Sequence, residues 1–257
     1  WGEGMSPVVI GDATLYLGDC MEVLPTLGKV DAVITDPPYG IPHTFSAQKH
    51  MDGGSRKLAF AWDGEHVNDS VIQAARHCAV LADAHFWFCG ITQISHLAQV
   101  LRESGMTDKM AAWVKTCPPP AMPGNWWPSG YEMAVYAYRS GAWFGDANSK
   151  RCNVFYSDSY RHGQPGKEEH PTQKPLGLIE KLTTSLCRPD GTVLDCFMGS
   201  GTAGVAAARA GRKFIGIERE PKYFDIACRR IEQAYNQRPL FEPEPQKKPE
   251  QLGLGAA

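Results

Sequence analysis

The amino-acid sequence predicts an α/β fold in which a mostly parallel β-sheet is covered by helices on both faces. Short runs rich in β-branched and aromatic residues alternate along most of the chain with longer segments of helical periodicity. That alternation is typical of parallel sheets joined by crossover helices. A glycine-rich turn between a buried strand and a helix, near the C-terminal end of the chain, supports the same class. With 257 residues, 43% of them hydrophobic, the chain is long enough for one well-packed domain.

Seven strands and five longer helices account for the regular part of the pattern. The strands are short apolar runs such as AHFWFC at 84–89, and the helices repeat apolar residues every three to four positions. A short helix is also expected between the first two strands, which makes a strand–helix–strand unit. The expected strands are 14–17, 31–35, 84–89, 109–115, 132–139, 191–197 and 213–218, and the longer helices are 69–81, 92–105, 175–187, 204–211 and 221–235.

Three segments lack the period of either a helix or a strand. Residues 41–60 are rich in Gly, His, Ser and Lys and are expected to form a mobile loop, because loops of this length are usually functional or disordered. Residues 141–169 carry mixed charge with Tyr, Gly and Pro, and residues 236–257 form a Pro- and Glu-rich flexible tail. We therefore expect a single domain over residues 5–235.

Composition excludes several classes of protein. The net charge of −2 lacks the basic excess of a typical nucleic-acid binder, so any such binding needs local patches. The eight cysteines include no CxxC pair, which argues against a zinc site or a disulfide framework and predicts reduced thiols and no metal. No apolar run approaches the roughly 20 residues of a membrane-spanning helix and no secretory signal is seen, so a cytoplasmic protein with no membrane partner is expected.

The glycine-rich turn lies in TVLDCFMGSGTAG, residues 192–204, where the glycines have the spacing G-x-G-x-x-G. Such a turn lets the backbone approach a ligand closely, and Glu218 at the end of the next strand is placed to accept hydrogen bonds from ribose hydroxyls. Alone, the motif fits any nucleotide-shaped cofactor, a dinucleotide included, or a purely structural turn. Asp195, just before the turn, would repel a pyrophosphate but favour an ammonium group, so it favours S-adenosylmethionine over NAD.

Four short motifs occur in a characteristic order: LGDC at 17–20, DPPY at 36–39, HPTQKP at 170–175 and DCFMGSGT at 195–202. In this order, continued by FIGIERE and YFDIACRRI, they resemble the permuted, beta-type DNA amino-methyltransferases, which use S-adenosylmethionine to methylate an exocyclic amino group of adenine or cytosine. The resemblance implies a Rossmann-like methyltransferase fold with a mostly parallel seven-stranded sheet. Permutation places the catalytic half of the chain first and the cofactor half last.

The resemblance also implies a set of cofactor-binding residues. The glycine turn would line the methionine end of the cofactor, the acidic end of the following strand its ribose, LGDC its adenine, and HPTQKP its carboxylate. The family often has a second threonine where this chain has Ala203, which puts one hydroxyl contact in doubt. The expected cofactor-binding residues are Asp19, Cys20, Thr172, Lys174, Asp195, Phe197, Gly199, Ser200, Gly201, Thr202 and Glu218.

The DPPY motif suits methyl transfer to an amino group. The lone pair of an exocyclic amino group is delocalised into the base, and acceptors at Asp36 and the carbonyl of Pro37 would localise it by accepting one N–H each. Pro37 and Pro38 have fixed φ, so the acceptors are pre-organised, and a direct in-line transfer needs no covalent intermediate. Tyr39 would stack on a base rotated out of the duplex. A proline-rich turn without catalytic function is the alternative reading of these four residues.

Double-stranded DNA is therefore the expected substrate, and DPPY rather than SPPY resembles the adenine-N6 members. Cytosine-N4 methylation, RNA methylation, a non-catalytic nucleic-acid-binding module and an NAD-dependent oxidoreductase stay open, as does an orphan or restriction-associated role. The segment 141–169 is short for target recognition, so a homodimer that adds DNA contacts is hypothesised. The candidate DNA contacts, which a merely solvated surface would also explain, are Lys49, Arg56, Lys150, Arg151 and Arg161.

Overall fold

The computed structural model describes residues 6–40, 67–118, 129–145, 152–159 and 172–237. In these ranges a nine-stranded sheet has the order β1-β2-β9-β8-β3-β4-β6-β5-β7. The strands are β1 Val8–Ile10, β2 Ala13–Leu17, β3 Ala32–Thr35, β4 Ala84–Cys89, β5 Thr107–Lys115, β6 Tyr131–Tyr138, β7 Val154–Ser157, β8 Thr192–Asp195 and β9 Lys213–Glu218. The helices are α1 Cys20–Val23, α2 Val67–Leu81, α3 Ile94–Glu103, α4 Leu176–Leu186, α5 Thr202–Arg209 and α6 Pro221–Asn236, with a 3₁₀ turn at Leu24–Thr26.

The sheet is mostly parallel, as predicted. β2, β9, β8, β3 and β4 pair in parallel, and so do β5 and β7. The antiparallel pairs are β1 with β2, β4 with β6 and β5 with β6. The predicted α/β class with a mostly parallel sheet is therefore confirmed.

The predicted count of seven strands is wrong, because the sheet has an additional strand at each edge. β1 and β7 have three and four residues, and each is covered only in part by the rest of the domain. Edge strands that are this short and half-exposed show neither a continuous apolar run nor a long alternation. β7 also lies inside 141–169, so this segment contains regular structure.

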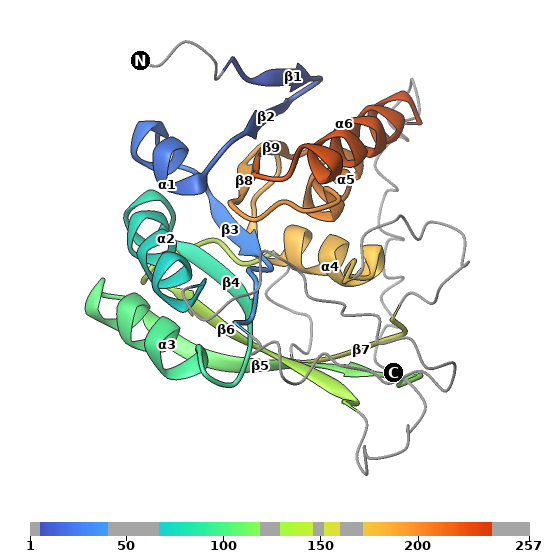
Figure 1. Cartoon of the computed structure of the whole chain (residues 1–257). Coiled ribbons are helices and arrows are strands. Elements are labelled where there is room, and N and C mark those ends of the chain that lie inside the picture. The colour runs from blue at the N-terminus through green and yellow to red at the C-terminus, as the bar shows by residue number, and fades with distance from the viewer. Residues whose placement is uncertain (1–5, 41–66, 119–128, 146–151, 160–171, 238–257) are drawn as a thin grey trace, which may run out of the picture.

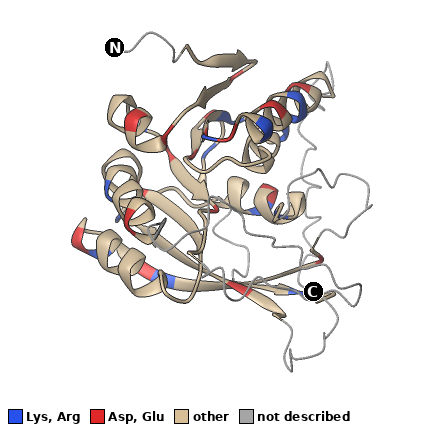
Figure 2. Ribbon diagram, in the orientation of Figure 1, with Lys and Arg blue, Asp and Glu red and all other residues tan. Residues whose placement is uncertain are grey.

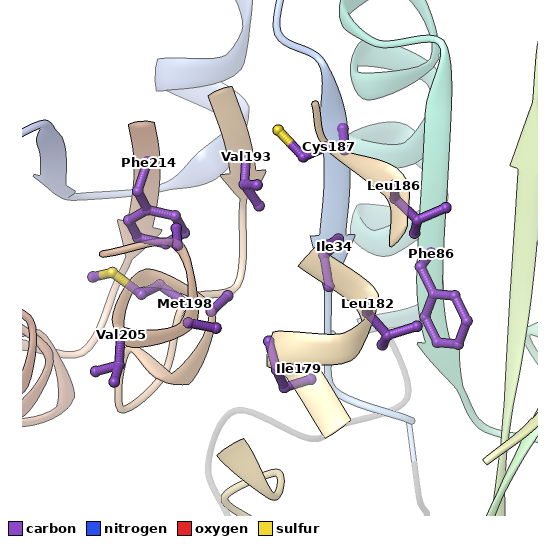
Figure 3. Close-up of a cluster of buried hydrophobic side chains, with 14 of the residues drawn as sticks. Ile34, Phe86, Ile179, Leu182, Leu186, Cys187, Val193, Met198, Val205 and Phe214 are labelled. Carbon is purple, nitrogen blue, oxygen red and sulfur yellow. The ribbon is translucent and has the colours of Figure 1, made fainter. Parts of the chain in front are cut away.

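Helices cover both faces of the sheet, as Figure 1 shows: α1, α2 and α3 pack on one side and α4, α5 and α6 on the other. Each face has its own core. Figure 3 shows part of the core on the side of α4, α5 and α6. Leu182 of α4 packs there beside Ile34 and Phe86 of the central strands, and Met198 lies beside Phe214 of β9. Side chains such as these are almost fully removed from water, and burial of this kind is the main favourable contribution to folding.

The parallel strands place the predicted motifs at one edge. The carboxyl ends of β2, β9, β8, β3 and β4 point the same way, and in the register Leu17 pairs with Glu218 and Val33 with Leu194. The chain leaves β3 toward β4 on one side, while β8 lies on the other. Ligands in open α/β sheets bind at such a switch point, beyond the carboxyl ends of the strands.

The described surface mixes charges of both signs. Figure 2 shows Lys and Arg residues along α6 next to acidic residues of the same helix. Among the helices whose residues are described, none is long and apolar enough to cross a bilayer.

Candidate active site

A cleft of about 330 Å³ opens at the carboxyl edge of the sheet. Its walls come from all four sequence motifs, which lie far apart along the chain. The predicted site residues that line it are Asp19, Cys20, Asp36, Pro37, Pro38, Tyr39, Thr172, Lys174, Asp195, Phe197, Gly199, Ser200, Thr202 and Glu218. A volume of this size is within the range of small-molecule sites.

Gly201, the remaining predicted cofactor-binding residue, is not among the residues that line the cleft and lies in the turn next to α6. Its φ is +76°, and a Cβ atom there would lie 2.8 Å from the Cβ of Ala227 in α6. Both the left-handed backbone and the close helix contact therefore require glycine. From the same side, the Arg230 guanidinium donates to the Ser200 carbonyl and, at 3.2 Å, to the Thr202 hydroxyl. The start of α5 is thus held against α6.

Asp195 is the acidic group at the head of the turn. Its Oδ1 accepts a hydrogen bond from the Thr35 hydroxyl at 2.6 Å and from the Phe197 N–H at 3.1 Å. The side chain is buried, and this burial raises the pKa of its carboxyl to about 7. Near neutral pH, Asp195 therefore exists in both protonation states and would gain charge beside a bound cation.

Two further carboxylates are fixed by backbone N–H groups. Glu218 accepts from Gly199 at 2.7 Å and from Glu220 at 2.8 Å, while burial raises the pKa of its carboxyl. Asp19 accepts from the Met21 N–H at 2.8 Å and so caps α1. Each carboxylate keeps acceptor capacity for hydroxyl or amino groups of a ligand.

The DPPY segment lines the same cleft as the turn and is held by Gln93, which is 1% exposed. The Gln93 side chain donates to the Pro38 carbonyl at 2.8 Å and accepts from the Gly90 N–H at 3.0 Å. At Gly90, a Cβ atom would lie 3.0 Å from the Cβ of Tyr39, so the two loops pack closely. The prolines and these contacts together make the segment rigid.

Asp36 and Tyr39 belong to a polar cluster with Lys174 and Glu132, in which Lys174 is buried and the other three residues are half-buried. The Tyr39 hydroxyl lies 2.9 Å from Asp36 Oδ1 and 3.0 Å from Glu132 Oε2. Lys174 Nζ forms ion pairs with Asp36 and, at 3.2 Å, with Glu132. Burial raises the pKa of the Asp36 carboxyl, whereas the Lys174 ammonium acts in the opposite direction.

Lys174 lines the cleft, and its predicted contact with the carboxylate of the cofactor stays a prediction. The Lys174 ammonium contacts Asp36, Glu132 and the Tyr39 hydroxyl, because a buried ammonium group is placed next to the anions that offset its desolvation. Thr172 lies at the rim of the same cleft and is exposed.

Several residues of the site were not found from the sequence. Thr35, Gln93 and Arg230 act through side-chain hydrogen bonds to segments distant in the chain, and their sequence neighbours give no signal of this. Glu132 did give a signal, because it is a lone carboxylate at the start of the apolar run MAVYAY, where a charged residue needs a partner. The five candidate DNA contacts, Lys49, Arg56, Lys150, Arg151 and Arg161, lie outside the described residues, as do the loop 41–60 and residues 238–257.

All eight cysteines are free. Within the described ranges, no group of three or more His, Cys, Asp or Glu side chains is arranged to hold a metal ion.

A parallel sheet of this order, with a glycine turn after β8 and an acidic residue ending β9, defines a Rossmann-like methyltransferase fold. The model of the DNA methylase family matches residues 30–229, and the chain belongs to that family. The prediction of a DNA methyltransferase from the four motifs is therefore confirmed, and its permuted, beta-type arrangement stays a prediction.

Curated relatives and solved structures agree with this family. The chain is 27% identical to the type II methyltransferase M2.DpnII of Streptococcus pneumoniae, over 79% of this chain and 83% of that protein. It is 29% identical to the type II methyltransferase M.HinfI of Haemophilus influenzae, over 85% and 68%. The crystal structure of the M1.HpyAVI–SAM complex is 29% identical, with a TM-score of 0.68 and coverage of 85% of this chain and 98% of that one. The cytosine-N4-specific PvuII DNA methyltransferase, 19% identical with coverage of 89% and 93%, shares the fold with a TM-score of 0.65.

Proposed function

We propose that the protein transfers a methyl group from S-adenosylmethionine to the N6 amino group of adenine in double-stranded DNA. The observation that carries this proposal is that DPPY and the glycine turn line the same cleft, so that Asp36 and Asp195 border one cavity. Membership of the DNA methylase family supports the reaction class, and DPPY favours adenine.

The residues present fit S-adenosylmethionine. The buried carboxylate of Asp195 fits an ammonium group, and the backbone-held Glu218 fits the hydroxyls of a ribose. The Asp195 carboxylate would repel the pyrophosphate of NAD, which argues against an oxidoreductase. A related protein of 29% identity has been solved as its SAM complex.

S-Adenosylmethionine, when bound, supplies an electrophilic methyl group. Asp36 accepts an N–H of the target amino group, and the Pro37 carbonyl accepts the other, so that the nitrogen lone pair points out of the base plane. Because Pro37 and Pro38 restrict the backbone and Gln93 holds the Pro38 carbonyl, these acceptors are oriented before the base arrives. The nitrogen becomes cationic as it attacks, and the Asp36 carboxylate stabilises that charge and is placed to take the released proton.

The target amino group is paired inside a duplex, so the base has to rotate out of the stack to reach Asp36. Tyr39, on the wall of the cleft, offers its ring for stacking.

The first test is to incubate the protein with unmethylated DNA and labelled S-adenosylmethionine, digest the DNA to nucleosides and identify the labelled base by mass spectrometry. Label on N6-methyladenine is the expected result. Label on N4-methylcytosine would show that the target base is cytosine, with the same mechanism. Label on RNA alone would show that the substrate is RNA and not DNA. No label on either nucleic acid would favour a non-catalytic binding module.

The Asp36→Ala variant tests the mechanism. Removal of one pre-organised acceptor of developing charge is expected to lower kcat by roughly 10²- to 10³-fold. The affinity for S-adenosylhomocysteine, measured by calorimetry, should stay within about two-fold because the glycine turn is unchanged. An Asp36→Ala protein that methylates at the normal rate would overturn the role of the carboxylate.

We also propose a cytoplasmic homodimer in which the second subunit extends the DNA contact. The support is the small size of 141–169, together with the exposed aromatic side chains of Tyr131 and Tyr156 at this end of the sheet. Light scattering with and without DNA tests it, and a monomer under both conditions would contradict it.

A further inference from the structure

We propose that Glu132 is a positioning residue of the methyl transfer, which keeps hold of the Lys174 ammonium and the Tyr39 hydroxyl while an amino group replaces Lys174 at Asp36. This inference rests on the proposed function. It assigns a role to a residue of β6 outside the four sequence motifs.

The Lys174 ammonium contacts the groups that a target base needs. Asp36 Oδ2 accepts its hydrogen bond, and the other Asp36 oxygen lies 2.9 Å from the Tyr39 hydroxyl. Lys174 Nζ also lies over the Tyr39 ring, 5.4 Å from its centroid, and 4.9 Å from the centroid of Phe88. A base that stacks on the Tyr39 ring from the side of Lys174 and donates to Asp36 Oδ2 takes the place of the ammonium at both.

Glu132 makes that displacement possible without removing all anionic partners from a buried cation. The Lys174 side chain is 7% exposed, and a buried charge left without a partner is strongly unfavourable. Glu132 Oε2 lies 3.2 Å from Lys174 Nζ, so the ammonium keeps one carboxylate when it leaves the other.

Glu132 is itself anchored from the far side. Its Oε1 forms an ion pair with Lys115 of β5 at 2.9 Å, and in the strand register it pairs with Trp113. The ammonium groups of Lys174 and Lys115 overcome the effect of burial and lower the pKa of the Glu132 carboxyl to about 2. Glu132 therefore stays ionised throughout the working range of pH.

Together with Lys115, the cluster has two carboxylates and two ammonium groups, so its formal charges balance. Replacing Glu132 by a neutral side chain leaves Asp36 as the only carboxylate beside Lys174 among the described residues, and the exchange with an amino group becomes harder. It also removes a negative charge that raises the pKa of the Asp36 carboxyl. The titratable groups that face Asp36 or Glu132 from the packed elements are Tyr39, Cys89, Lys115, Lys174 and Asp195.

The test is the Glu132→Gln variant, which keeps the size of the side chain. We expect kcat/KM for DNA to fall by roughly 10- to 100-fold, in the range observed for misplaced catalytic groups. The acid limb of its pH profile should move to lower pH, whereas affinity for S-adenosylhomocysteine should change by less than about two-fold. Glu132→Asp keeps the charge, so its acid limb should match that of the unmodified protein. The matched surface control is Glu103→Gln, which loses only contacts of an exposed side chain to Arg76 and Gln99.

A second readout needs no substrate. The carboxyl carbon of Asp36, assigned by its loss in Asp36→Asn, is titrated by NMR in the unmodified protein and in Glu132→Gln. A lower pKa for Asp36 in the variant supports the proposal. An unchanged pKa, or an acid limb that does not move while activity falls, would reduce Glu132 to a structural role and overturn it.

The two readouts separate this inference from the proposed function. If the unmodified protein methylates no DNA, the proposed function fails, and the titration still decides whether Glu132 controls Asp36. If Glu132→Gln does not fold, as circular dichroism would show, Lys115→Gln takes its place. That variant releases Glu132 from its anchor and is expected to lower kcat/KM at unchanged S-adenosylhomocysteine affinity; an unaltered kcat/KM would overturn the proposal.

Discussion

The Thr35→Val substitution isolates the hydrogen bond that supports Asp195. Valine has nearly the shape of threonine but cannot donate to the Asp195 carboxylate, which now accepts from the Thr35 hydroxyl at 2.6 Å. Thr35 is only 2% exposed, so water cannot easily replace the lost donor. The carboxylate form of Asp195 is destabilised as a result, and the pKa of Asp195 rises further.

The size of the effect follows from the bond that is lost. A hydrogen bond to a charged group contributes ~1.5–3 kcal/mol, which corresponds to a further rise in pKa of about 1–2. Because burial already raises the pKa of Asp195 to about 7, about half of the protein carries the carboxylate at pH 7. In the variant this fraction falls to about one tenth or less. Affinity for a ligand that needs the carboxylate should then fall by about 5- to 50-fold at pH 7.

The sign of the pH dependence provides the sharper test. A carboxyl whose pKa is raised gains its charge as pH increases, so affinity should increase through pH 7 in the unmodified protein and at a higher pH in the variant. At pH 9 the two should differ by about two-fold or less.

Calorimetric titration with S-adenosylhomocysteine from pH 6 to 9 measures this ratio, in which the titration of the ligand itself cancels. Thr184→Val, at an exposed position of α4, controls for the loss of a hydroxyl. Equal affinities at pH 7, or a deficit that persists unchanged at pH 9, would refute the role assigned to Thr35.

Three further substitutions test how the site is held. Gly201→Ala should destabilise the fold by about 2–4 kcal/mol in urea unfolding, because it combines a left-handed backbone with a clash against Ala227. The control is Gly211→Ala, where φ is +68° and the space is open, so only the cost of the left-handed backbone is expected. Equal losses of stability in the two variants would contradict the clash. Gln93→Ala leaves two backbone groups without their partner and should cost about 1–3 kcal/mol of stability together with a fall in kcat, whereas unchanged kinetics would show that the clamp is structural only. Arg230→Gln should weaken S-adenosylhomocysteine binding at constant kcat, and a normal affinity would show that α6 does not hold the turn.

Most of the fold could be predicted from the sequence because it is encoded locally. The run AHFWFC is fully buried in the centre of the sheet, and its predicted bounds agree with β4. Helix 175–187 has its apolar residues on one face and forms α4 at Leu176–Leu186. β1 and β7 were not predicted because such short edge strands bury little surface and depend on their neighbours for hydrogen bonds.

The same distinction holds for the site. The glycine turn and DPPY each consist of consecutive residues whose types suit one chemical task. The sequence by itself therefore determined the reaction class, the cofactor class and the loops that carry the two motifs. The tertiary structure alone decided that Lys174 meets Asp36, 138 residues away, that Glu132 joins Tyr39 across 93 residues, and that Thr35 supports Asp195 across 160. These pairs arise from strand order and burial, because a charge enclosed by packing has to find its partner wherever the sheet places one, and no local pattern records that choice.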